Sequence, residues 1–383
     1  MKHSYIAKRF QSSAAGLSLD TEALAKYKDI IDLSIGDTDF TTDESIINAA
    51  FRDAKAGHTH YGDPKGDPEL IDAVCRAWEE DFGQRLPRDH VLVSASSCLG
   101  MALVMLAILD PGDEVIVFSP YFPMYREQIE LAGGVCVDVP TYASEDYAID
   151  EARLRAAITP RTKAIVFNNP TNPTGMGYDG KTLELLARVA QEHDLLIAAD
   201  EIYTTYLYEG DFRPIRTLPG MAERTITLNS FSKNFLMTGW RVGVIIAEPE
   251  LLAVMNRVNG SLIYSAPSIS QRAAIQALAM RKEIREKYVT AYRDRIFYAA
   301  DRIEKLPYLS LVRPKGTFYL FPGVEKTGLD EKAFCKVLLD QAHVLVSPGT
   351  PFGVSAAGHF RIACTVGIDQ LKTAFDRMEK LSF

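Results

Sequence analysis

Short apolar segments that alternate with helical patterns are the feature of this sequence that most restricts its fold. Each segment is followed by turn residues and then by a helical pattern, and the segments begin at His90, Asp113, Val135, Lys163, Leu195, Thr225 and Val242. Strands that are apolar throughout are buried on both faces, as in a mostly parallel sheet covered by helices. The alternation therefore predicts a layered α/β fold.

The pattern changes after about residue 249, where long charged amphipathic segments replace the alternation. The segment from Arg281 predicts a long helix, "GTFYLFPG" and "HVLVSPGT" predict strands, and "GIDQLKTAFDRMEKL" predicts a closing helix. We therefore expect a second, α+β unit, with a boundary inside the long helix near residue 285.

Composition excludes several classes of function. The 383 residues are 47% apolar and 24% charged, which is typical of a globular protein. A net charge of -8 argues against binding to nucleic acid or to an anionic membrane. The first residues lack the apolar region of a signal peptide, and no apolar segment is long enough to predict a transmembrane helix.

Cysteine and histidine spacing predicts neither a disulfide framework nor a metal site. The five cysteines are scattered and form no CxxC motif, which favours reduced thiols in the cytoplasm. His58 and His60 form an HxH pair, but no third ligand has a supporting spacing.

Polar residues follow the predicted strands, where ligands bind in open α/β sheets. In "SASSCLGMALV", the amides of Ser96, Ser97 and Cys98 could hold a phosphate at a helix start near Leu99, although a simple helix N-cap explains the serines as well. In "NNPTNPTG", the prolines indicate a rigid turn, which could also orient Asn172 as a hydrogen-bond donor to a ligand.

Charged residues occupy two further strand ends. Asp200 ends an apolar strand, where a carboxylate needs a partner such as an arginine or a cationic ligand nitrogen, and Tyr203 could face the same space. "NSFSKNFLMTGWRVG" carries Lys233 and Arg241 and no acidic residue. Partial burial lowers the pKa of a lysine and frees its amine for Schiff-base chemistry, while an arginine suits a phosphate.

Taken together, these residues describe a single ligand. A helix start, Arg241, Ser230 and Ser232 could hold a phosphate, and Asp200 could pair with a protonated ring nitrogen. Asn172 and Tyr203 could hold a ring hydroxyl, and Lys233 could react with an aldehyde. Pyridoxal 5′-phosphate carries all of these groups.

The order of the motifs resembles that of the class I/II aminotransferases, which are fold-type I pyridoxal-phosphate-dependent enzymes, and in particular their aspartate/aromatic aminotransferase-like branch. The resemblance covers nearly the whole chain and rests on "IGDTDF", "HYGDPKGDPEL", "LDPGDEVIVFSPYFPMY", "NNPTNPTG", "AADEIY", "SFSKNFLMTGWRVG" and "GHFRIACT". It implies a large pyridoxal-phosphate-binding domain (46–285) with a seven-stranded, mostly parallel sheet between helices. An N-terminal arm (1–45) and the C-terminal part (286–383) are implied to build a smaller α+β domain.

The resemblance also implies a role for each matching residue. Lys233 would form the Schiff base and move the proton between substrate and cofactor, Asp200 would keep the ring nitrogen protonated, and Asn172 and Tyr203 would bind the ring 3′-oxygen. The phosphate would be held by Ser97, Cys98, Ser230 and Arg241, and by Tyr61 of the neighbouring subunit in a homodimer. Phe122, with Tyr121 as the alternative, would stack on the ring. Arg361 would bind the substrate α-carboxylate, with Gly36 and Asn172 beside it.

The implied reaction is ping-pong transfer of an amino group between an L-amino acid and a 2-oxo acid. Two positions depart from the family pattern: Ser96 stands where glycine is common, and Cys98 stands where relatives that favour dicarboxylic substrates can carry a basic residue. The second departure argues against strict aspartate specificity, although glutamate or 2-oxoglutarate is the default for one partner.

Three alternatives use the same fold. A cystathionine β-lyase-like C–S lyase and an amino-acid decarboxylase both use pyridoxal phosphate, although "NPTNPTG" favours the transferase. A non-enzymatic module, as in transcription factors with an aminotransferase-like domain, would be expected to carry a DNA-binding domain before "IGDTDF", where only about 30 residues stand.

Overall fold

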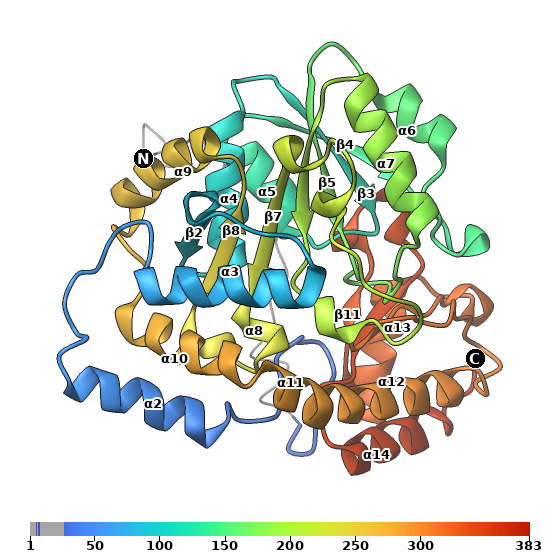
Figure 1. Cartoon of the computed structure of the whole chain (residues 1–383). Helices are drawn as coiled ribbons and strands as arrows, with labels where there is room; N and C mark the ends of the chain where they lie inside the picture. Colours follow the sequence, from blue (N-terminus) through green and yellow to red (C-terminus); the bar gives the residue numbers. More distant parts are fainter. Residues whose placement is uncertain (1–4, 6, 8–26) are drawn as a thin grey trace.

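A seven-stranded sheet forms the centre of the larger part of the molecule (Figure 1). The computed structural model describes Tyr5, Ala7 and residues 27–383, so most of the predicted N-terminal arm lies outside the described residues. In spatial order the strands are β2 (Val91–Ser94), β8 (Gly243–Ile246), β7 (Thr225–Ser230), β6 (Leu196–Asp200), β5 (Thr162–Asn168), β3 (Glu114–Ser119) and β4 (Val135–Pro140). Only β8 runs antiparallel to its neighbours, so the predicted mostly parallel sheet is confirmed.

Burial on both faces holds for the inner strands but not for β4. This strand lies at the edge of the sheet, where it pairs only with β3, and most of its residues are partly exposed. Val135, at its start, is 47% exposed. The prediction that every apolar segment is fully buried was wrong for β4, whereas β2, at the other edge of the sheet, is buried throughout.

Helices cover both faces of the sheet. One face packs against α4 (Ser97–Ile108), α5 (Met124–Leu131) and α9 (Pro249–Leu262), which share an apolar core with β3. The opposite face packs against α6 (Glu151–Ala157) and α7 (Gly180–Glu192). The helices α2 (Glu44–Lys55), α3 (Pro68–Phe82) and α10 (Ser268–Ala279) pack together beside β2 and β8.

The long helix predicted from Arg281 contains a π-helical turn. It comprises α11 (Arg281–Ile284), the π turn η8 (Arg285–Val289) and α12 (Thr290–Ile303), so the irregular turn lies at the boundary predicted near residue 285. Apolar residues before the turn join the core beside β2 and β8, whereas those from Ile296 onward join a second core. The division into domains at this point stays a prediction.

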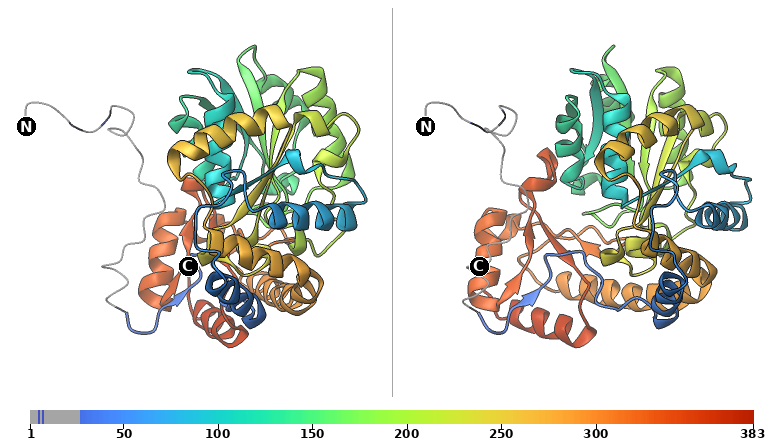
Figure 2. Two further views of the ribbon diagram at one scale, coloured as in Figure 1. Left: turned by 60° about the vertical axis from the view of Figure 1, so that its left-hand side comes forward. Right: turned by 90° about the vertical axis from the view of Figure 1, so that its left-hand side faces the viewer.

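The second core combines the C-terminal part of the chain with residues near its beginning. An antiparallel sheet orders β11 (Ser347–Pro348), β12 (Phe360–Ala363) and β9 (Tyr319–Leu320), and β1 (Ile31–Asp32) pairs in parallel with β10 (Val344–Leu345). Figure 2 shows β1, in blue, beside this C-terminal part, in red. The remaining helices here are α13 (Glu331–Val337), which continues into the π turn η10 (Leu338–Ala342), and α14 (Ile368–Met378).

The parallel strands bring separate parts of the sequence to one edge of the sheet. The carboxyl ends of β5, β6 and β7 lie side by side, because these strands pair in register. β1, β9 and β12 belong to the small sheets described above, and Gly36, Tyr319 and Arg361, which lie on or near these strands, face the same space. No helix in the described part of the chain is long and apolar enough to cross a membrane.

Candidate active site

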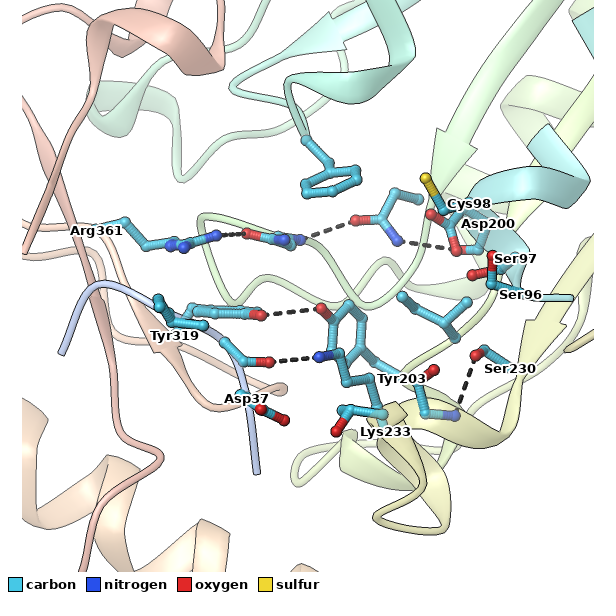
Figure 3. Close-up of a pocket in the computed structure, with 18 of the residues that line it drawn as sticks. Asp37, Ser96, Ser97, Cys98, Asp200, Tyr203, Ser230, Lys233, Tyr319 and Arg361 are labelled. Carbon is cyan, nitrogen blue, oxygen red and sulfur yellow. Dashed lines mark hydrogen bonds between the residues drawn. The ribbon is translucent and has the colours of Figure 1, made fainter. Parts of the chain in front are cut away.

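A cavity of about 710 Å³ lies where the sheet edge meets the second core (Figure 3). Its lining includes the residues predicted from the sequence with two exceptions, Tyr61 and the alternative residue Tyr121. The predicted residues in the lining are Gly36, Ser97, Cys98, Phe122, Asn172, Asp200, Tyr203, Ser230, Lys233, Arg241 and Arg361. The fold therefore gathers side chains that are far apart in the sequence into one cavity.

Lys233 extends into this cavity from α8 (Phe231–Asn234), a short helix that starts at the end of β7. The Ser230 side chain caps the helix by accepting a hydrogen bond of 3.1 Å from the Ser232 amide. The Lys233 Nζ donates a hydrogen bond to the Gly36 carbonyl. Burial lowers the pKa of the Lys233 amine to about 8, against the opposing effect of the Asp37 carboxylate. About a tenth of the amine is therefore neutral one pH unit below this pKa, far more than for an ordinary lysine, and the neutral form is the nucleophile.

Asp200 is the last residue of β6, and the two oxygens of its buried carboxylate differ in their hydrogen bonding. One oxygen, Oδ2, accepts a hydrogen bond from the Tyr125 hydroxyl, whereas Oδ1 has no partner. Burial raises the pKa of Asp200 to about 6, and the hydrogen bonds from Tyr125 and from the Ile202 amide oppose this. A buried acceptor without a partner is costly, so Oδ1 suits a ligand that donates a hydrogen bond or carries a positive charge.

Arg361 lies at the other end of the cavity and is held by several groups. It donates hydrogen bonds of 3.0 Å to Asn172 Oδ1 and of 2.6 Å to the Ser34 carbonyl. Its guanidinium lies 4.7 Å from the centre of the Tyr319 ring and 5.1 Å from that of Phe352. The buried Nε has no partner, so a donor remains for an anionic ligand group such as a carboxylate.

Tyr203 and Gly36 both meet Tyr319. The hydroxyls of Tyr203 and Tyr319 are 3.1 Å apart, and both side chains are buried. A Cβ at Gly36 would lie only 1.8 Å from the Tyr319 hydroxyl, so the N-terminal segment can pass this close only as glycine. The close passage also brings the Gly36 carbonyl to Lys233.

The start of α4 forms a further wall of the cavity. Ser96 caps the helix with a hydrogen bond of 3.0 Å from the Leu99 amide to its hydroxyl, so the predicted N-cap is present and the helix starts at Ser97. The φ of Ser96 is 153°, which explains why glycine also suits this position. A Cβ at Gly243 would approach the Ser97 amide to 2.8 Å, so β8 needs glycine beside this turn.

Arg241 adds a cation near the start of α4. The residue adopts a left-handed φ of 56°, and its guanidinium donates a hydrogen bond of 2.7 Å to the Thr238 carbonyl. Within residues 27–383, neither Arg241 nor Lys233 forms an ion pair with a carboxylate. Helix amides and an unpaired arginine together make a site for an anion such as a phosphate.

Two predicted positions lie outside the cavity. Phe122 lines it, whereas the alternative Tyr121 is buried elsewhere and accepts a hydrogen bond of 2.9 Å from Arg126. Tyr61 is 87% exposed, and its ring packs edge-on against Tyr264 at 5.0 Å. The described chain therefore does not bring Tyr61 into its own cavity.

Several residues of the cavity were not predicted from the sequence, among them Asp37, Tyr125, Gln128 and Tyr319. Tyr125 ends the segment "SPYFPMY", three residues after Phe122, so a helical spacing could have indicated that both face one side. Tyr319 lies in "GTFYLFPG", which predicts only a strand. Its position depends on contact between the two parts of the molecule, which no local pattern reveals.

Comparison with known proteins places the chain in a family. Residues 28–378 match the family described as aminotransferase class I and II. The aspartate/prephenate aminotransferase of Thermus thermophilus is 39% identical over 92% of this chain and 91% of its own length. The arginine–pyruvate transaminase of Pseudomonas aeruginosa is 35% identical over 99% of this chain and 97% of its own length.

Solved structures agree with the sequence matches. A double mutant of the Thermus thermophilus aspartate aminotransferase superimposes with a TM-score of 0.94 at 35% identity, covering 99% of this chain and all of the other. The aromatic aminotransferase of Pyrococcus horikoshii gives a TM-score of 0.90 at 34% identity, covering 94% and 97% of the two chains. These relatives are named for amino-group transfer, so the lyase and decarboxylase alternatives are not favoured. The chain therefore belongs to the aminotransferase class I and II family, and it is an aminotransferase with the fold of the pyridoxal-phosphate-dependent enzymes.

Proposed function

We propose that this cavity binds pyridoxal 5′-phosphate and that the enzyme moves an amino group between an L-amino acid and a 2-oxo acid by a ping-pong mechanism. The observation that carries the proposal is that one cavity contains two groups. These are the Lys233 amine, which is partly neutral, and a buried oxygen of Asp200 that has no hydrogen-bond partner. The first group suits the cofactor aldehyde and the second suits its protonated ring nitrogen.

The other lining residues fit the rest of the cofactor. The amides of Ser97 and Cys98, the Ser230 hydroxyl and the Arg241 guanidinium would hold the phosphate. Asn172 and Tyr203 would bind the ring 3′-oxygen, and Phe122 would lie against the ring. When bound, the cofactor supplies an aldehyde that reacts with amines and a ring that withdraws electrons.

The protein's own groups then bind the substrate and move protons. Arg361 would bind the substrate α-carboxylate with its free Nε and a neighbouring nitrogen, while Gly36 keeps the N-terminal segment close to it. The Lys233 Nζ would take the proton from the substrate Cα and deliver it to the cofactor C4′. Asp200 would remain ionised and keep the ring nitrogen protonated.

The charges of the cavity bear on the amino donor. Asp200, Lys233, Arg241 and Arg361 have the roles above, which leaves Asp37 as the remaining charged residue among the described lining. This subunit thus offers no further cation to a second substrate carboxylate. We infer that donors with uncharged side chains are accepted and that specificity is not strict for aspartate. The relatives' names, which include aspartate/prephenate, arginine–pyruvate and aromatic aminotransferases, cover a similarly wide range.

The working form would be a homodimer in which Tyr61 reaches the phosphate bound by the neighbouring subunit. Tyr61 is exposed and lies outside its own cavity, next to Tyr264, which is 46% exposed. Leu262 and Ile263 add exposed apolar surface in the same segment, as expected of an interface. Five unpaired cysteines support a location in the cytoplasm.

Reduction of the cofactor-loaded enzyme with borohydride tests the core of this proposal. Peptide mapping should find the pyridoxyl group on Lys233, and an adduct on any other residue would refute the assignment. Adding an amino donor without an oxo acid should convert the absorption spectrum to that of the pyridoxamine form and then stop after one turnover. Continuous release of pyruvate and ammonia from a cysteine conjugate would instead support the lyase.

A further inference from the structure

Tyr125 lines the cavity beside Asp200, and the proposed function above gives it no role. It lies in the first turn of α5, is 3% exposed, and its ring meets that of Phe122 edge-on at 5.7 Å. Its hydroxyl donates to Asp200 Oδ2. The two oxygens of one carboxylate are thus distinguished, because only Oδ1 remains without a partner.

We propose that Tyr125 is a positioning residue that fixes the Asp200 carboxylate so that Oδ1 alone faces the cofactor ring nitrogen. This inference rests on the proposed function, because it concerns the same cofactor. Without the Tyr125 hydroxyl, the carboxylate could rotate about its terminal torsion, which is only loosely restricted in aspartate. It would also lose one of the hydrogen bonds that favour its ionised form.

The remaining titratable groups around Asp200 leave Tyr125 as its main side-chain partner. Tyr203, Cys98 and Glu201 interact electrostatically with Asp200, but none of them donates a hydrogen bond to its carboxylate. Burial raises the pKa values of Tyr125 and Tyr203 well above their ordinary range, so both stay protonated. Burial likewise raises the pKa of Cys98, so the thiol stays neutral at physiological pH.

The consequence is a defined pH dependence of cofactor binding. Asp200 must be ionised to pair with a protonated ring nitrogen, so affinity should fall as the pH drops through the Asp200 pKa, which is about 6. Removing the Tyr125 hydroxyl should raise the pKa of Asp200, because the hydrogen bond that opposes the effect of burial is then lost. The pH at which affinity falls should therefore rise.

Pyridoxal-phosphate affinity of the apoenzyme, measured by equilibrium dialysis across a pH series, tests this inference. In Tyr125→Phe, the pH at which affinity falls should rise by about one unit, the size expected for losing one hydrogen bond to a charged group. Tyr147→Phe is the matched control, because Tyr147 is buried outside the cavity and its hydroxyl has no partner. Its curve should coincide with that of the wild type.

The same substitution made in an Asp200→Asn enzyme separates a positioning role of Tyr125 from a general loss of structure. In Asp200→Asn, where the group that titrates is gone, adding Tyr125→Phe should leave the pH profile unchanged. Continued weakening in that background would show that Tyr125 acts through the fold, and it would overturn the inference. So would an unshifted Tyr125→Phe curve in an enzyme that still forms the borohydride adduct on Lys233. Failure of that adduct in the wild type would refute the proposed function itself.

Discussion

Arg361 donates a hydrogen bond of 3.0 Å to Asn172, which joins β12 in the second core to the turn that follows β5 in the main sheet. The partners are 189 positions apart in the sequence. Because the same guanidinium also donates to the Ser34 carbonyl and lies against Tyr319, its orientation is fixed before any ligand arrives. Preorganisation of this kind lowers the cost of binding.

Arg361→Lys should weaken substrate binding while leaving cofactor binding intact. A lysine keeps the charge but cannot bind a carboxylate through two parallel hydrogen bonds, so kcat/KM should fall by about a hundredfold, mainly through KM. Steady-state kinetics and cofactor affinity measure the two effects separately. The control is Arg126→Lys, since Arg126 lies outside the cavity lining. Equal losses in both variants would argue against a specific role for Arg361.

Capture of pyridoxal phosphate by the apoenzyme should accelerate as the pH rises toward 8. The Lys233 pKa is about 8, so below this value the reactive neutral amine increases about tenfold for each pH unit. Because the Asp37 carboxylate raises this pKa, Asp37→Asn should lower it and speed capture at neutral pH by about threefold. Stopped-flow absorbance measures the rate. Asp211→Asn, at an exposed position outside the cavity, should have no effect.

Cys98→Lys should increase the use of aspartate relative to an uncharged donor. In the proposed complex, the cationic residues of the cavity already bind the cofactor or the substrate α-carboxylate. The substitution adds a further cation, which attracts the side-chain carboxylate of aspartate. We expect the ratio of kcat/KM for aspartate to that for alanine to rise about tenfold. Cys98→Ser removes the thiol without adding charge and should leave the ratio unchanged. A rise in Cys98→Ser as well would contradict the electrostatic explanation.

Hybrid dimers can test whether Tyr61 serves the neighbouring site. Tyr61→Phe should lower pyridoxal-phosphate affinity about tenfold through loss of a hydrogen bond to the phosphate, and Lys233→Ala should abolish the borohydride adduct. In a hybrid of the two variants, the intact Lys233 receives an intact Tyr61 from the other subunit. Its affinity at that site should return to the wild-type value. If the hybrid retains the affinity of the Tyr61→Phe enzyme, the tyrosine does not act across the interface.

Glu201→Gln should make the apoenzyme less sensitive to alkaline pH. Burial raises the pKa of Glu201 from 4.5 to about 8, so the folded state holds a proton that the unfolded state has lost. The stabilisation is complete below the unfolded pKa and is lost as the pH rises through about 8. The variant should therefore melt at a higher temperature than the wild type near about pH 9 and at a similar one near about pH 5. Scanning calorimetry measures this, with the exposed Glu184→Gln as control.

Local sequence patterns predicted much of the cavity because strand ends are local features. Asp200 ends an apolar strand, Asn172 and Lys233 follow two others, and parallel pairing brings such ends together without further information. The resemblance of ordered motifs added Gly36 and Arg361, which lie near the beginning and near the end of the chain. The same reasoning overestimated the burial of β4, because the order of strands in the sheet cannot be read from any one strand.

The sequence by itself determined the layered α/β class, the strands and the polar residues at their ends, since periodicity and turn residues act over short distances. Only the tertiary structure decided which residues complete the cavity. Tyr125 reaches Asp200 and Tyr319 reaches Tyr203 through contacts between elements 75 and 116 residues apart. Burial in those contacts, rather than residue type, leaves one oxygen of Asp200 without a partner and lowers the pKa of Lys233.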